Sequence, residues 1–230
     1  DAKNYVENWD TSGWNDIKVP SSIQTIKDAD GNFKYEKPIY VNQRYPWQNY
    51  ENVSLGANVT APTVNNSVGQ YKRTFTVPSD WDGRDVFVSF EGVESAFYLY
   101  VNGQRVGYGE DSYTTDEFNI TSYLKKGENT IAVEVYRWST GSYLENQDFI
   151  RMSGIFRDVN LYSKAKVEMR DLFVKTDLDK NYKDATLTLD ADIRKQADAM
   201  KYKVEKEAEA DLIRRQKEAE AQKFEAIQQA

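Results

Sequence analysis

Cysteine and histidine are both absent from this chain of 230 residues. Without cysteine there is no disulfide framework, no thiolate nucleophile and no thiolate metal site. Without histidine there is no Ser-His-Asp triad and no imidazole to bind zinc.

An excess of positive charge is absent, and so are long apolar runs. The chain has 30 Lys and Arg residues against 37 Asp and Glu residues, which gives a formal net charge of -7. Because nucleic-acid phosphates favour clustered Lys and Arg, we expect no nucleic-acid partner. No apolar run approaches the ~18 residues of a membrane-spanning helix, so we expect no membrane partner. The sequence begins at Asp1 without a signal peptide, and leaves a cytoplasmic or a periplasmic location open.

Glycine, proline and tryptophan are confined to the first part of the chain. All 12 Gly, all 5 Pro and all 5 Trp precede residue 191, whereas residues 191-230 carry 9 basic and 9 acidic side chains. Such a shift in composition marks a boundary. We therefore divide the sequence into residues 1-165, 166-193 and 194-230.

The first segment has the pattern of antiparallel strands. Apolar side chains alternate with polar ones in several short runs, for example at Val86, Val88 and Phe90. Asn102-Gly103 lies between two such runs, and this dipeptide favours a tight hairpin because both residues tolerate positive φ. Many short strands with little helix predict a mainly β fold, a sandwich.

The second segment predicts two more strands. Residues 167-176 and 185-191 alternate in the same way, and the polar turn at residues 179-181 separates them. Because a lone hairpin is marginally stable in water, the two strands are expected to be the start of a second, truncated sheet domain.

The third segment predicts a long C-terminal α-helix. It lacks Gly and Pro, it is rich in Ala, Glu, Lys and Gln, and it repeats every eleven residues. Asp190 or Asp192 is expected to cap the helix start. Two interpretations stay open: a solvated single helix, or self-association through one face, which carries Ala197, Ala208 and Ala219 beside Tyr202, Ile213 and Phe224.

Aromatic, amide and carboxylate side chains gather in three loops. They lie in the segments 38-47, 107-121 and 137-159. Such side chains suit a sugar, whose CH faces stack on rings while its hydroxyls form hydrogen bonds, although aromatic residues in sandwiches more often belong to the core. Glu145 and Asp148 are three residues apart, but spacing alone does not make them the acid and nucleophile of a glycosidase.

The same loops resemble a known family. The segments VNGQRVGYGEDSYTTDEFNIT and LKKGENTIAVEVYRWSTGSYLENQDFIRMSGIFRDVNL, with PIYVNQRYP and GQYKRTFTVP, closely resemble the amino-terminal domain of bacterial β-galactosidases of glycoside hydrolase family 2. The resemblance covers roughly residues 5-190. It implies a jelly-roll sugar-binding domain, followed by the first strands of an immunoglobulin-like sandwich. The catalytic barrel of that family has no counterpart in this sequence.

The resemblance also implies roles for particular residues. Asn42, followed by Gln43, falls on the family loop that reaches the galactose site, and Asp148 falls on an acidic residue that contacts galactose and helps to hold sodium. Magnesium is implied only for the complete enzyme. The sequence departs from the family at Asn146, which replaces the first Asp of the family's motif, and at Ile150 and Ile23. No catalytic residue is expected here. Arg151, Arg157 and Asp158 are expected to tie the domain to its neighbours or to close a buried ion pair.

The tail carries a second resemblance. Residues 203-230 resemble the C-terminal coiled-coil region of flotillin-like scaffold proteins, so the whole chain is interpreted as a chimera. The main hypothesis is a non-catalytic fragment of a β-galactosidase that helps to form the galactose site of a barrel outside this chain. It is expected to be inactive alone and to bind galactosides weakly. The alternatives are a stand-alone carbohydrate-binding module and a scaffold that assembles through its helix.

Overall fold

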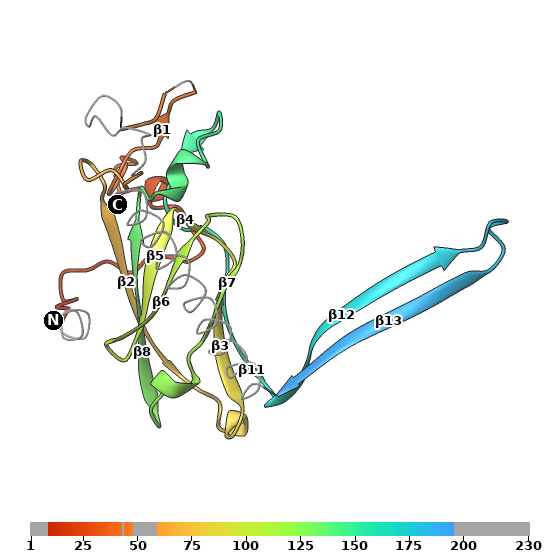
Figure 1. Cartoon of the computed structure of the whole chain (residues 1–230). Helices are drawn as coiled ribbons and strands as arrows, with labels where there is room; N and C mark the ends of the chain where they lie inside the picture. Colours follow the sequence, from red (N-terminus) through yellow and green to blue (C-terminus); the bar gives the residue numbers. More distant parts are fainter. Residues whose placement is uncertain (1–8, 43, 48–58, 196–230) are drawn as a thin grey trace, which may run out of the picture. The chain divides into compact units, whose positions relative to one another are not determined.

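A computed structural model describes residues 9-42, 44-47 and 59-195 (Figure 1). The chain divides into two compact units, residues 1-163 and 164-230, and each is described by itself. Within the described residues, no helix is long and apolar enough to span a bilayer.

The first unit is built around two antiparallel sheets. One has four strands in the order β2 (Val68–Thr76), β8 (Glu128–Tyr136), β5 (Ala96–Val101) and β6 (Gln104–Glu110). The other has three strands in the order β11 (Val159–Lys164), β3 (Asp85–Phe90) and β7 (Asp116–Asn119). Two short strand pairs lie outside these sheets, β1 (Ile39–Tyr40) with β9 (Ile150–Arg151) and β4 (Val93–Glu94) with β10 (Gly154–Ile155). The 3-10 helices are η1 (Ile23–Thr25), η2 (Ser79–Trp81), η3 (Thr121–Tyr123) and η4 (Gly141–Tyr143).

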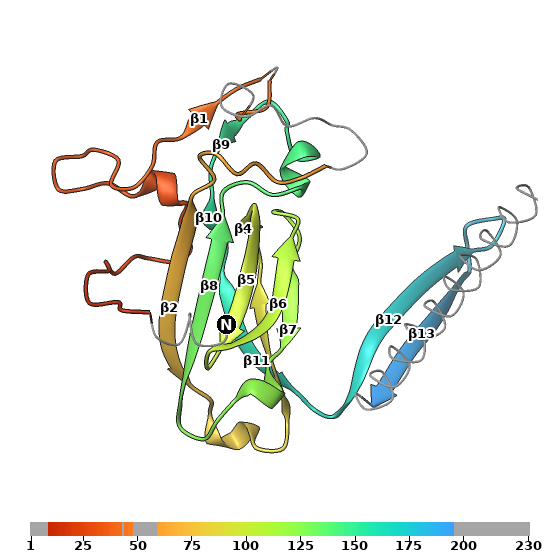
Figure 2. The same cartoon turned by 60° about the vertical axis from the view of Figure 1, so that its left-hand side comes forward.

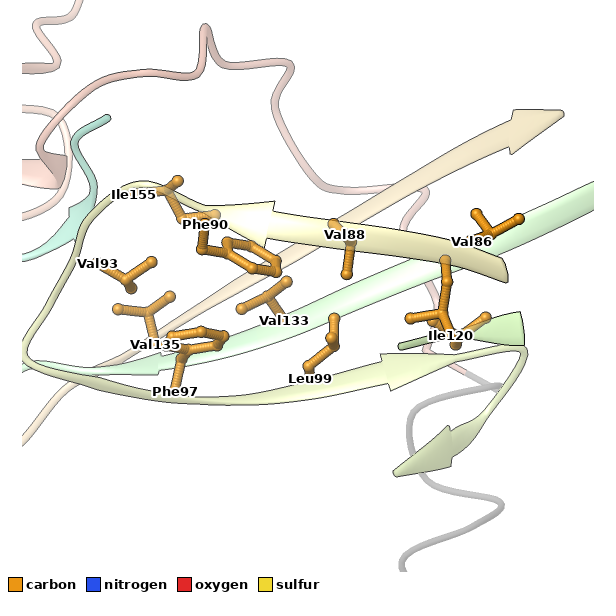
Figure 3. Packing of buried hydrophobic residues seen from close by; sticks show 11 residues of the cluster. Val86, Val88, Phe90, Val93, Phe97, Leu99, Ile120, Val133, Val135 and Ile155 are labelled. Carbon is orange, nitrogen blue, oxygen red and sulfur yellow. The ribbon is translucent and has the colours of Figure 1, made fainter. Parts of the chain in front are cut away.

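The two sheets face each other across one apolar core, so the predicted sandwich is confirmed. Figure 3 shows side chains of β3, such as Phe90, pointing toward Leu99 of β5 and Val133 of β8. Each large apolar side chain that is fully buried stabilises the fold by about 1.5–3 kcal/mol. The buried cluster consists of Val86, Val88, Phe90, Val93, Phe97, Leu99, Val101, Ile120, Val133, Val135 and Ile155.

The predicted hairpin at Asn102-Gly103 joins β5 to β6. Asn102 has a φ of 48° and Gly103 a φ of 76°, so both adopt the left-handed conformation that this pair of residues tolerates. The side chain of Asn102 donates to Asn129 Oδ1 at 2.8 Å, which ties the turn to the start of β8.

The second unit contains a long hairpin of β12 (Val167–Leu178) and β13 (Ala185–Lys195). Both predicted strands are present, and each is longer than predicted. Cross-strand register places most apolar side chains on one face, for example Val174 opposite Leu189. This apolar face is exposed: its members Met169, Leu172, Val174, Leu178, Leu187, Leu189 and Ile193 are 48–66% exposed.

The predicted long C-terminal helix is wrong for the residues that the structure describes. The expected caps lie inside β13, where Asp190 is opposite Phe173 and Asp192 is opposite Asp171. Leu187, Leu189 and Ile193 follow a period of two, and backbone pairing with β12 overrides the cap-like aspartates. The longest helix in the described part of the chain has three residues.

The remainder of the predicted helix, residues 196-230, lies outside the described residues. Nothing in the structure supports the flotillin-like coiled coil or the chimera. The strand β13 continues to Lys195 across the point at which the sequence was divided.

Candidate functional site

Strands β1 and β9 bring two of the predicted loops together. Tyr40 is opposite Ile150, and Ile39 is opposite Arg151. Figure 2 shows this pair at one end of the sandwich, beyond the ends of β2 and β8. The segments that carry Asn42 and Asp148 therefore meet at one edge of the domain, although about a hundred residues separate them in sequence.

A hydrogen bond from Tyr40 to Asp148 joins the two loops. The Tyr40 hydroxyl donates to Asp148 Oδ1 at 2.7 Å, and Asn42 hydrogen-bonds to the same phenol. The bond to Asp148 raises the pKa of Tyr40, because losing the phenolic proton would remove the bond and place two negative charges together. Tyr40, Asn42 and Asp148 are all exposed. Gln43, the other predicted residue, lies outside the described residues.

Arg151 holds the loop that carries Asp148. Its guanidinium donates to the carbonyl oxygen of Glu145 at 3.0 Å, to Asn146 Oδ1 at 2.6 Å and to the carbonyl oxygen of Gln147. It also lies 4.2 Å from the ring centroid of Phe149. The side chain is 97% buried, and burial lowers the pKa of Arg151 because the charged form loses its hydration.

A buried ion pair was one of two expectations for Arg151, Arg157 and Asp158, and neither arginine forms one within the described part of the chain. Arg157 instead donates to the carbonyl oxygens of Glu91 and Tyr113. Both arginines bind backbone carbonyls, and the sequence gives no signal for such partners because every residue has a carbonyl.

Glu145 is a structural anchor. Its two carboxylate oxygens accept the backbone N–H and the hydroxyl of Ser112, each at 2.7 Å. Both oxygens are therefore occupied by groups of the fold. Glu145 thereby ties its loop to the residue that follows Asp111.

Buried aromatic rings pack against Ile39 of β1. Trp47 and Trp138 are 2% and 6% exposed and meet edge to face at 5.4 Å. Tyr45 stacks on Trp47 at 5.1 Å. These rings are core residues, as aromatic residues in sandwiches mostly are, and they fix the end of the loop that starts at Pro38.

An ion pair that the sequence did not reveal fixes the beginning of that loop. Arg137, which follows β8, bonds to Glu36 Oε2 at 2.8 Å and to the carbonyl oxygen of Lys37 at 3.2 Å. The buried amide of Gln24 donates to the same carboxylate oxygen at 2.9 Å. Residues 36-40 are thus tied to the sandwich directly before Asn42.

Two hollows in the first unit are small. One cavity, between Trp47 and Arg151, has a volume of about 10 Å³. A second, between Lys72 and Tyr100, has a volume of about 40 Å³. A single water needs about 10–15 Å³, so neither cavity holds a hexose.

Comparison with known proteins identifies the family. The family model described as "Glycosyl hydrolases family 2, sugar binding domain" matches residues 2–165. The chain belongs to this family. The resemblance stated from its loops is confirmed, and so is its interpretation as a sugar-binding domain.

Curated relatives carry the name β-galactosidase. The chain is 56% identical over 180 residues to a β-galactosidase of Priestia megaterium, which covers 78% of this chain and 16% of that protein. It is 41% identical over 194 residues to one of Halalkalibacterium halodurans, covering 84% of this chain and 18% of that protein. The chain therefore spans less than a fifth of the length of these relatives.

Solved structures share the fold. A Bacteroides uniformis β-glucuronidase 2 matches with a TM-score of 0.59 at 23% identity, over 82% of this chain and 20% of that one. A second β-glucuronidase from the same organism matches with a TM-score of 0.51 at 27% identity, over 56% of this chain and 16% of that one.

Proposed function

We propose that this chain supplies one wall of the galactoside site of a β-galactosidase, with Asn42 and Asp148 contacting the sugar. The observation that carries the proposal is the Tyr40–Asp148 hydrogen bond across β1 and β9, which sets both residues on one exposed edge. Asp148 Oδ2 forms no hydrogen bond among the described residues, so it is open to accept one from a hydroxyl. The names of the curated relatives supply the substrate class.

The proposed role is binding and not bond cleavage. Hydrolysis of a glycoside requires two carboxylates about 5–9.5 Å apart on either side of the bond. Glu145 is occupied by Ser112, and Asp148 is held by Tyr40. We place the catalytic carboxylates on a part of the enzyme outside this chain, which spans 16% of the Priestia megaterium relative.

A sodium ion belongs to the same proposal. The open oxygen of Asp148 is a suitable single ligand for a hard cation. The described residues contain no group of three or more acidic, His or Cys side chains that could enclose a metal. The remaining ligands would therefore be carbonyl oxygens, water, the sugar itself or groups outside this chain, and no described residue is assigned to magnesium.

An exchange experiment tests the proposal. Residues 1-165 replace the corresponding region of the Priestia megaterium β-galactosidase, and hydrolysis of a chromogenic β-galactoside is measured. We expect the hybrid to be active and Asp148→Ala to lower its kcat/KM at least about 10-fold, since a hydrogen bond to a charged carboxylate is worth about 1.5–3 kcal/mol. Asp82→Ala, an exposed carboxylate beside η2, is the matched control. Equal activity of the two variants would contradict the proposal.

The isolated chain provides a second test. We expect no hydrolysis and no calorimetric binding of galactose tighter than millimolar, because a few hydrogen bonds do not offset the entropy of association. Saturable binding that Asp148→Ala abolishes would instead establish a stand-alone carbohydrate-binding module.

A further inference from the structure

The smaller cavity lies directly behind the loop that carries Asp148. Its volume is about 10 Å³. Loop residues form one side of it, and residues of β4 and of the end of β8 form the other. The lining consists of Pro46, Trp47, Glu94, Ser95, Arg137, Trp138, Ser142, Glu145, Asn146 and Arg151.

Three buried N–H groups on residues of this lining have no hydrogen-bond partner among the residues that the structure describes. They are Trp47 Nε1, Arg137 Nε and Arg151 Nε, on side chains that are 2%, 7% and 3% exposed. The other two nitrogens of Arg137 donate to Glu36 and Lys37. The other two nitrogens of Arg151 donate to the loop that carries Asp148. A buried donor without a partner costs about 1–3 kcal/mol, so three around one cavity indicate a ligand that accepts hydrogen bonds.

The same cavity also presents acceptors. Glu94 lines it, and desolvation, followed by the charge of Glu145, raises the pKa of Glu94 to about 7. The carboxyl group of Glu94 accepts a bond from the backbone of Met152 and retains further acceptor capacity. Donors and acceptors therefore share one small volume.

We propose that this cavity is the binding site of one internal water molecule that links the Asp148 loop to the sandwich. The water accepts N–H groups from the Trp47 and arginine side of the cavity and donates to Glu94. A cavity of this volume is just large enough for one water molecule. A buried water also requires two to four polar partners, which the lining supplies. One water molecule can accept hydrogen bonds from at most two of the three N–H groups.

A small anion fits the cavity less well. It accepts hydrogen bonds but donates none, so it would leave Glu94 unmatched and would face the charge of Glu145. Arg137 is already neutralised by Glu36 at 2.8 Å. Water, which both donates and accepts, suits the mixed lining.

The bound water completes the hydrogen bonding of Arg151, which makes Arg151 a positioning residue for Asp148. One end of its guanidinium holds the loop at Glu145, Asn146 and Gln147. The remaining N–H reaches the sandwich through the water. This role does not depend on what Asp148 binds, and it survives if the proposed function fails.

Magnetic resonance of the whole chain labelled with ¹⁵N-tryptophan tests the proposal. We expect the Trp47 indole proton to give cross-peaks to water of opposite sign in laboratory-frame and rotating-frame experiments, as a long-lived water does. The Trp47 signal is identified by its loss in Trp47→Phe and its persistence in Trp138→Phe. The partly exposed indole of Trp14 is the control for surface water. Absence of the Trp47 cross-peaks would overturn the proposal.

Bromide distinguishes water from an anion. In crystals grown with sodium bromide we expect water density in the cavity and no anomalous peak. The Trp47 indole resonance is likewise expected not to shift with bromide concentration. An anomalous peak between Trp47 and Arg151, or a saturable shift, would reject the water and assign an anion site.

Discussion

The sandwich and the β12–β13 hairpin are both antiparallel strands with alternating apolar side chains, yet only one of them encloses a core. Leu99 in β5 is 0% exposed, whereas Leu189 in β13 is 59% exposed. In both strands every second side chain faces the same side of its sheet, and Leu99 and Leu189 each lie among apolar side chains on that side. The difference is the second sheet, which covers β5 in the sandwich and which the described part of the hairpin lacks. Alternation thus specifies a strand, while a second layer supplies the stability.

The largest expected difference between the sandwich and the hairpin is in the rate of amide hydrogen exchange. We expect amides of β8 between Ile131 and Val135 to exchange at least about 1,000-fold more slowly than those of β12 and β13, since core strands open only with global unfolding. Exchange is followed by mass spectrometry or magnetic resonance. Equal protection would show that another layer covers the hairpin.

A matched pair of substitutions measures the same difference as stability. Leu99→Ala should lower the free energy of unfolding by about 2–5 kcal/mol, because it leaves a cavity in a packed core. Leu189→Ala should change it by less than about 0.5 kcal/mol. Urea unfolding, monitored by tryptophan fluorescence, gives both values. A loss of several kcal/mol in Leu189→Ala would mean that the apolar face of the hairpin is covered.

A buried carboxyl group in the sandwich makes the stability of that region depend on pH. Glu94 in the sandwich has its pKa raised from 4.5 to about 7, chiefly by desolvation. Between these values the unfolded chain releases the proton that the folded chain keeps, so stability falls as pH rises and the loss is complete above about pH 7. The loss amounts to about 3 kcal/mol.

The variant Glu94→Gln isolates this contribution. Its unfolding free energy, measured by urea titration from pH 4 to pH 8, should lack the decline that Glu94 causes in the wild type. Parallel pH profiles for the two proteins would show that Glu94 ionises normally in the folded state.

The smallest expected effect lies in the hairpin. Asp171 and Asp192 are directly opposite each other, and like charges in this position are destabilising by about 0.2–1 kcal/mol. Asp171→Asn should therefore slow exchange in β12 and β13 by about 1.4-fold to 5-fold at neutral pH and should leave β8 unchanged. Faster exchange in the variant would contradict the assigned register.

Local patterns predicted the strands well, and long-range pairing accounts for what they missed. The alternation of Val86, Val88 and Phe90 and the Asn102-Gly103 turn are local signals, and both were confirmed. The helix start was wrong because Asp190 and Asp192 resemble caps while their strand is fixed by pairing with β12. Only that pairing distinguishes the two outcomes.

In the candidate site, too, some residues could be predicted from the sequence and others only from the fold. Resemblance to a family pointed to Asn42 and Asp148, but no local pattern identified Tyr40 as the link between them or Arg151 as the residue that holds the loop. Both roles depend on β1 lying beside β9. Glu36 and Arg137, which are 101 residues apart, were equally invisible before the fold placed them together.

The β1–β9 pair also has a consequence for the order in which the protein is made. The Tyr40–Asp148 bond closes a separation of 108 residues. During synthesis the segment around Tyr40 leaves the ribosome well before its partner exists, at about 5–20 residues per second. The β5–β6 hairpin is complete long before then. Since contacts of long sequence separation form slowly, the edge formed by Tyr40, Asn42 and Asp148 should be among the last parts of the nascent domain to assemble.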